Sequence, residues 1–155
     1  MPDNRKERSC FVIGPMRDSE LGNRARLIKL AREVVRPLLQ EIEQRDGVHY
    51  RVTTPYDLGG NHVMNDVLYA IDRADMVIAD LTESNPNVFY ELGITHALGR
   101  ACITVMEERQ PKIEFDISAY RVYRLNLDDE QYVEAQRRLR EPLEKVHRTI
   151  SDWSK

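Results

Sequence analysis

Short apolar segments alternate with longer amphipathic ones along this chain, and that alternation restricts the folds open to it. Residues 10–14, 76–79 and 101–106 are mainly apolar runs of strand length. Between them, apolar residues recur every three or four positions, as on one face of a helix. Strands that are apolar on both faces are typical of a parallel sheet with helices on each side. With right-handed crossovers, the pattern predicts a doubly wound α/β fold, a flavodoxin-like three-layer sandwich of about five parallel strands.

The expected elements follow this pattern from end to end, in one domain that spans residues 1–155. Strands are predicted at 10–14, 49–54, 76–79, 101–106 and 120–125, and helices at 23–44, 61–73, 85–99 and from 128 onward. Pro37 lies inside the first of these helices and is expected to bend it. The polar segment 1–8 is expected to be a flexible N-terminus.

The composition favours a globular protein that binds neither nucleic acid nor a membrane. Hydrophobic residues make up 41% of the 155, and 23 basic against 26 acidic side chains give a net charge of −3. The basic clusters at 5–8, 24–29 and 137–140 are each followed closely by acidic residues, which is typical of solvated helix faces. Apolar runs stay well short of the roughly 20 residues of a membrane span, and the N-terminus lacks a signal-peptide pattern. Cys10 and Cys102 lie within apolar runs, which indicates reduced thiols and a cytoplasmic setting.

Several common kinds of site are disfavoured because their motifs are missing. The turn after the first predicted strand, GPMRDS at residues 14–19, matches neither the GxGxxG dinucleotide fingerprint nor a phosphate loop. The sequence contains no HExxH, CxxC or close Cys/His cluster, so no zinc site is expected, and it contains no GxSxG elbow. Flavin binding stays open on this fold, although the loops show no aromatic pair to enclose the ring. We therefore predict no metal and no other cofactor.

The residues that follow the strands are the candidates for a ligand site, because doubly wound sheets bind ligands beyond the carboxyl ends of their strands. Three segments fall there: 14–17, 55–61 and 80–91. The candidate site residues in them are Gly14, Pro15, Met16, Arg17, Asp57, Asp80, Asn85, Asn87 and Glu91. Asn85 is also expected to cap the helix that Pro86 begins.

Glu91 is the acidic residue whose position suggests chemistry. It shares a helical stripe with Asn87, Ile94 and Leu98, so it is expected at the border between the core and the ligand cleft. Partial burial tends to raise the pKa of such a carboxyl group, whereas the helix N-terminus lowers that pKa. A carboxylate at this border can attack, or stabilise, a cation that develops at a sugar C1′. The same position also suits a structural glutamate, so spacing alone leaves the reaction open.

Residues 74–99, ADMVIADLTESNPNVFYELGITHALG, carry a resemblance to a known family. This segment resembles the nucleoside 2-deoxyribosyltransferase-like family, and the resemblance extends to CFVIGPM at 10–16 and more loosely to FDISAY at 115–120. It therefore covers most of residues 10–125. The family is related in fold to TIR domains, whose enzymatic members cleave NAD.

The resemblance implies roles for individual residues. Glu91 matches the catalytic carboxylate of the Tyr-Glu-Leu-Gly element, and Asp80 matches an aspartate expected to bind the sugar or to protonate the leaving base. The loop 14–17 would hold sugar or phosphate, with a further phosphate contact from Ser118. Asp66, on the helix before the third strand, would face the base. The resemblance also implies a homodimer or a larger homo-oligomer.

Two departures bear on the substrate. The deoxynucleoside-monophosphate N-glycosidases of this family have a serine in the first loop where this chain has Pro15, and the Ser/Tyr start of TIR domains is missing here. Our leading hypothesis is an enzyme that cleaves the N-glycosidic bond of a nucleoside, a nucleotide or a related N-riboside, by hydrolysis or by transfer to a second base. The alternatives are a NAD glycohydrolase that uses the same Glu91, and a non-catalytic nucleotide-sensing or interaction module.

Overall fold

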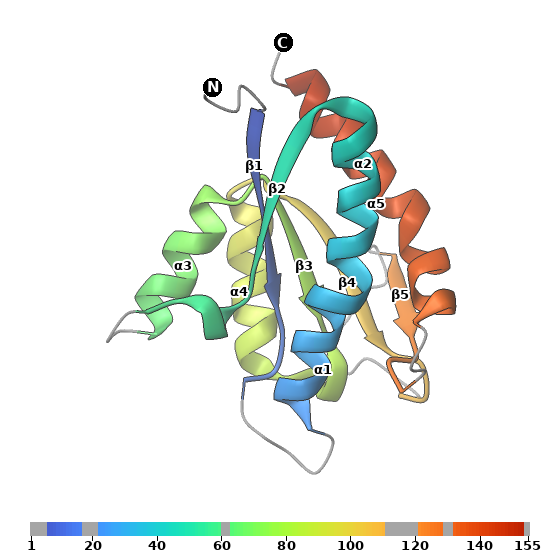
Figure 1. Cartoon of the computed structure of the whole chain (residues 1–155). Coiled ribbons are helices and arrows are strands. Elements are labelled where there is room, and N and C mark those ends of the chain that lie inside the picture. The colour runs from blue at the N-terminus through green and yellow to red at the C-terminus, as the bar shows by residue number, and fades with distance from the viewer. Residues whose placement is uncertain (1–5, 17–21, 60–62, 111–120, 129–131, 154–155) are drawn as a thin grey trace.

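One parallel sheet forms the centre of the structure, a computed structural model that describes residues 6–16, 22–59, 63–110, 121–128 and 132–153. The strand order is β2-β1-β3-β4-β5, and all neighbours pair in parallel (Figure 1). The strands are β1 (Lys6–Ile13), β2 (Val48–Thr53), β3 (Met76–Asp80), β4 (Ala101–Glu107) and β5 (Val122–Leu125). This is the flavodoxin-like order that the alternating pattern predicted.

Strand β1 begins earlier than predicted. Residues 6–8 pair with β2, so the prediction that they belong to a flexible N-terminus is wrong. The reason is Arg8, which is only 4% exposed. Its guanidinium donates hydrogen bonds to the Tyr50 hydroxyl at 3.2 Å and to the Ser151 Oγ at 3.0 Å. These partners lie far along the chain, on β2 and on the last helix, so no local sequence pattern indicates that Arg8 is buried.

The helices are α1 (Asn23–Lys29), α2 (Arg36–Asp46), α3 (Val63–Arg73), α4 (Pro86–Ala97) and α5 (Val133–Trp153). A π-helical stretch, Leu30–Val35, joins α1 to α2 just before Pro37, where the sequence predicted a bend. Proline has no amide hydrogen to donate to the carbonyl four residues back. That carbonyl belongs to Glu33, and it accepts a hydrogen bond of 2.8 Å from the Gln136 side chain on α5 instead.

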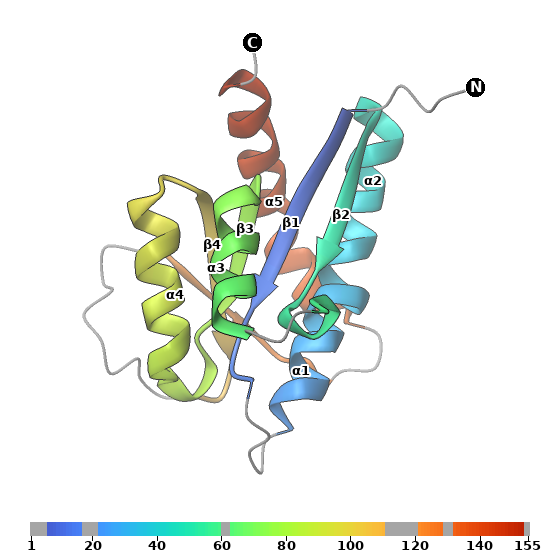
Figure 2. The same cartoon turned by 90° about the vertical axis from the view of Figure 1, so that its left-hand side faces the viewer.

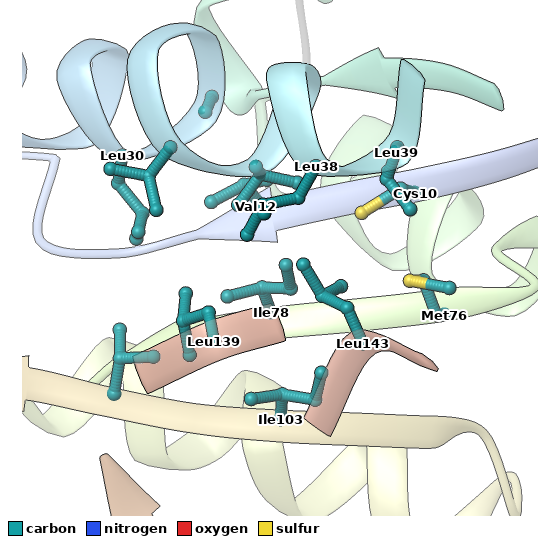
Figure 3. Packing of buried hydrophobic residues seen from close by; sticks show 14 of the residues in the cluster. Cys10, Val12, Leu30, Leu38, Leu39, Met76, Ile78, Ile103, Leu139 and Leu143 are labelled. Atoms are coloured by element: carbon teal, nitrogen blue, oxygen red, sulfur yellow. The ribbon is translucent and has the colours of Figure 1, made fainter. Parts of the chain in front are cut away.

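Helices cover both faces of the sheet, which makes the three predicted layers (Figures 1 and 2). Helices α1, α2 and α5 lie on one face, and α3 and α4 lie on the other. Neighbouring residues on a strand point to opposite faces. On β3, Ile78 packs with the first group of helices (Figure 3), whereas Val77 packs with the second. Both side chains are fully buried, as expected for a strand without a solvent face.

The two cysteines are free thiols, Cys10 buried and Cys102 half-buried. Burial raises the pKa of Cys102 to about 12, so it is a thiol rather than a thiolate near neutral pH. None of the helices within the described ranges combines the length and the apolar character needed to cross a bilayer.

Replacing one isoleucine on each face tests the double burial of the sheet. Ile13 packs beneath α3 and α4, Ile78 packs beneath α1 and α5, and both are fully buried. We expect Ile13→Ala and Ile78→Ala each to lower the free energy of unfolding by about 2–5 kcal/mol, because each leaves a cavity. The exposed control Val133→Ala should change it by less than about 0.5 kcal/mol. Urea unfolding followed by circular dichroism measures all three, and a small loss at either isoleucine would show that its face is open.

Candidate active site

Strands β1 and β3 end side by side, and close packing at their carboxyl ends explains the first loop. Gly14 and Pro15 are buried there, and Met16 is half-buried. A Cβ atom on Gly14 would lie 2.9 Å from Leu27 Cδ1 and 3.2 Å from Asp80 Cβ. Any larger residue would therefore push β1 away from α1 and from the end of β3.

The first loop is tied to the turn after β2. The Met16 carbonyl accepts a hydrogen bond of 2.9 Å from the Tyr56 hydroxyl, and the Arg24 guanidinium lies 4.9 Å from the centre of the Tyr56 ring. Arg17 and Ser118, two of the predicted substrate contacts, lie outside the described residues.

Asp57 and Asp66 are placed very differently. Asp57 closes a capping box with Thr54, whose amide and hydroxyl donate to its Oδ2 at 2.8 and 2.9 Å, so it mainly shapes the turn after β2. Asp66 lies on the first turn of α3 and is half-buried. Its Oδ2 is buried without a hydrogen-bond partner among the described residues. A buried acceptor without a donor is costly, so this atom is suited to meet a donor on a ligand.

Asp80 is buried at the end of β3 and makes strong contacts with both carboxylate oxygens. Its Oδ2 accepts a hydrogen bond of 2.8 Å from Arg26 Nε on α1. Its Oδ1 accepts bonds from the Thr82 hydroxyl at 2.5 Å and from the Thr82 amide at 3.2 Å. A second guanidinium nitrogen of Arg26, Nη1, donates to Glu107 at 2.6 Å. As found here, Asp80 is the counter-ion of Arg26, and a sugar contact would have to compete with these bonds.

The turn between β3 and α4 holds an unusual backbone. Glu83 and Ser84 have φ values of 65° and 50°, in the left-handed region that residues with a Cβ seldom adopt. Each such residue costs roughly 1–2 kcal/mol. Hydrogen bonds offset this cost, since the Glu83 amide donates to the Gln110 side chain at 2.7 Å and the Ser84 amide donates to the Leu81 carbonyl at 3.0 Å.

Asn85 caps α4, as the sequence predicted. Its side-chain oxygen accepts a hydrogen bond of 2.9 Å from the Asn87 amide, and Pro86 occupies the first helical position. Asn87 is exposed on the first turn of α4. The cap therefore fixes where α4 begins, and the beginning of α4 fixes the position of the residues on its second turn.

Glu91 lies on that second turn and is only 6% exposed. Its carboxyl group makes no hydrogen bond and no ion pair with any described residue. Burial raises its pKa to about 7, because the ionised form loses its water and no cation or donor in the described part of the chain replaces it. The position between core and edge agrees with the helical stripe seen in the sequence. A carboxyl group with this pKa is present in both protonation states at neutral pH.

The structure does not bring Asp80 and Glu91 into contact, although both lie at the carboxyl edge of the sheet. Asp80 points toward α1 on one face, whereas α4, which carries Glu91, covers the other face. In the described part of the chain, no three His, Cys, Asp or Glu side chains are placed to hold a metal ion.

Arg26 is the functional candidate that the sequence reading missed. The basic cluster 24–29 predicts a solvated position for Arg26, and this is wrong, because Arg26 is only 8% exposed. A signal was present: Arg26 stands four and eight residues before Leu30 and Val34, so it continues the buried stripe of the same helix. A cation on a buried stripe predicts an anionic partner inside the fold.

Among known proteins, the chain is similar in fold to solved structures, but it matches no family model and no curated protein. Among solved structures, it is similar to a 2-deoxyribosyltransferase from the psychrotolerant bacterium Bacillus psychrosaccharolyticus, with 13% identity, a TM-score of 0.53 and coverage of 79% of this chain and 90% of that one. A second similar structure is the 2-deoxyribosyltransferase of Leishmania mexicana, with 19% identity, a TM-score of 0.41 and 69% coverage of each chain. The chain has a 2-deoxyribosyltransferase-like fold.

The buried carboxyl group of Glu91 makes the stability of this fold depend on pH. The pKa of Glu91 is raised by folding, so between about pH 4.5 and 7 the folded chain binds a proton that the unfolded chain releases. Stability from this residue is therefore lost as pH rises through that window. We expect Glu91→Gln to raise the melting temperature at pH 8 and to have little effect at pH 5, since glutamine resembles the protonated acid. Thermal unfolding of both proteins across this range measures the difference, and a constant offset would contradict it.

Proposed function

We propose that this chain is an enzyme that cleaves the N-glycosidic bond of a nucleoside, a nucleotide or a related N-riboside. The observation that carries the proposal is the Glu91 carboxyl group, which is buried, has no partner among the described residues and lies at the carboxyl edge of the sheet. Doubly wound sheets bind ligands at that edge. The fold shared with 2-deoxyribosyltransferases supports the reaction class.

In the proposed reaction, the ionised Glu91 acts on the sugar C1′. The bond from C1′ to the base nitrogen breaks, its electron pair leaves with the base, and the base takes up a proton. The Glu91 carboxylate forms a bond to C1′ or stabilises the oxocarbenium-like cation there. Water or a second base then attacks C1′, loses a proton that balances the one taken up by the departing base, and releases the carboxylate. Access of water to the closed site decides between hydrolysis and transfer.

The other site residues take supporting roles in the proposal. The segment 14–16 covers the sugar, and the exposed Asn87 orients it from the first turn of α4. Asp66 contacts the base, which is supported by its buried and unpaired Oδ2.

An oligomer is also part of the proposal. Helices α3 and α4 lie next to each other on one face of the sheet (Figure 2) and expose large apolar side chains, namely Met64, Tyr69, Tyr90 and Leu98. This surface is suited to bury against another copy of the chain as the predicted homodimer or larger homo-oligomer.

Release of free base tests the reaction. Deoxynucleosides, ribonucleosides, their monophosphates and NAD are each incubated with the protein, with and without a second base, and products are separated by chromatography. We expect release from at least one class, and a loss of about 100-fold or more in Glu91→Gln, because the charge that stabilises the transition state is gone. Glu134→Gln, an exposed glutamate on α5, is the matched control and should keep full activity.

The outcomes separate the alternatives. Release from NAD alone selects a NAD glycohydrolase that uses Glu91. If the folded protein releases no base from any substrate and binds nucleotides equally well with Glu91→Gln, it is a binding module and the proposal is wrong.

The pH profile tests the protonation state that the proposal requires. Because the reaction needs the ionised form of Glu91, kcat/KM for the responsive substrate should rise between pH 5 and 8, with a midpoint near the Glu91 pKa of about 7. Initial rates at low substrate concentration measure this profile. A rate that falls over the same range would mean that Glu91 acts as a proton donor instead.

A further inference from the structure

A closed ring of hydrogen bonds joins four residues behind the candidate site. Arg26 Nε donates to Asp80 at 2.8 Å, and Arg26 Nη1 donates to Glu107 at 2.6 Å. The Thr82 hydroxyl donates to Asp80 at 2.5 Å and accepts a bond of 3.0 Å from the Glu107 amide. The ring therefore links α1, the end of β3, the turn after β3 and the end of β4.

The ring leads directly into the strained turn. Thr82 is the member that stands directly before this turn, and the left-handed residues Glu83 and Ser84 follow it. Asn85, the cap of α4, comes next. Left-handed conformations at residues with a Cβ persist only where the surroundings impose them. With Thr82 held by Asp80 and by β4, the turn has one fixed end, and α4 begins at a defined place.

We infer that Arg26 is a positioning residue for the chemistry proposed at Glu91, acting through Asp80, Thr82 and the turn that starts α4. Arg26 holds the Asp80 carboxylate in the place that orients Thr82, and no other cation among the described residues pairs with Asp80. Asp80 then serves as counter-ion and anchor instead of touching the sugar. This inference rests on the proposed function for its kinetic consequences, but the placement of Glu91 can be measured without any reaction.

The kinetic test uses Arg26→Lys, which keeps the charge but cannot bond Asp80 and Glu107 through two nitrogens of one guanidinium. Misplacing a reacting group by about 1 Å costs on the order of 100-fold, so we expect kcat to fall at least about tenfold while KM changes less than about threefold. The midpoint of the pH profile should also move to lower pH, because a loosened α4 lets water reach Glu91. Arg36→Lys is the matched control, since Arg36 binds Glu43 through two nitrogens on α2, away from the turn. It should leave kcat and the midpoint unchanged.

A thermal test measures the effect of Arg26 on the surroundings of Glu91 without an activity assay. The melting-temperature gain from Glu91→Gln at pH 8 is measured in the wild-type, Arg26→Lys and Arg36→Lys backgrounds. We expect the gain to shrink only with Arg26→Lys, because Glu91 is then better hydrated. If the wild-type protein releases base from no substrate, the proposed function is wrong. The thermal comparison still shows whether Arg26 positions Glu91.

Two results would overturn the inference. In the first, Arg26→Lys loses as much stability as Arg36→Lys but keeps the wild-type kcat. It also keeps the wild-type midpoint of the pH profile and the full melting-temperature gain from Glu91→Gln. The other is a raised KM at unchanged kcat, which would mean that Arg26 contacts the ligand from the cavity of about 750 Å³ that it lines. If Arg26→Lys does not fold, Thr82→Val opens the same ring from its other side and should give the same kinetic and thermal changes.

Discussion

A buried ion pair between Arg26 and Asp80 joins helix α1 to the end of β3, and the geometry of the carboxyl edge depends on it. Arg26 is 8% exposed and Asp80 is 1% exposed, so both ions have left water at a cost of several kcal/mol each. Hydrogen bonds with Thr82 and Glu107 offset part of that cost, although Arg26 Nη2 is buried without a partner among the described residues. If one partner were removed, the other would stay buried as an uncompensated charge. The end of β3, the turn after it and α1 are therefore stable only as one unit.

The same edge holds a second buried carboxyl group in the opposite situation. Asp80 has a cation and a hydroxyl within hydrogen-bond distance, whereas Glu91 has neither among the described residues. Burial without compensation raises the pKa of Glu91 to about 7. Two acidic residues of one fold can therefore have different roles, because their surroundings differ. The contrast agrees with the roles proposed above, an anchor at Asp80 and a reacting group at Glu91.

The fold was predictable where a local pattern has a single physical explanation. The apolar run 76–79 could only be a strand buried on both faces, and uniformly apolar strands led to the parallel order that the structure has. The burial of Glu91 was predictable in the same way, because its helical stripe places it at the border of the core. Arg8 and Arg26 were missed because their burial depends on partners more than 40 residues away in sequence, such as Tyr50 and Asp80. The nearby cations alone assign both residues to the surface, and only Arg26 has a local sign of burial, its place on the stripe of Leu30 and Val34.

Three residues that lower the stability of this chain lie close together in the sequence. Glu83 and Ser84 are strained, and Glu91 loses hydration without gaining a partner among the described residues, all between β3 and the second turn of α4. A protein selected only for stability would do better with glycine in that turn and with glutamine or leucine at position 91. Unfavourable features that gather at the edge where this fold binds ligands are expected of a functional site. Glutamine would fill the same space at position 91 without the cost of burying a carboxylate. The property that glutamate supplies there and glutamine lacks is negative charge.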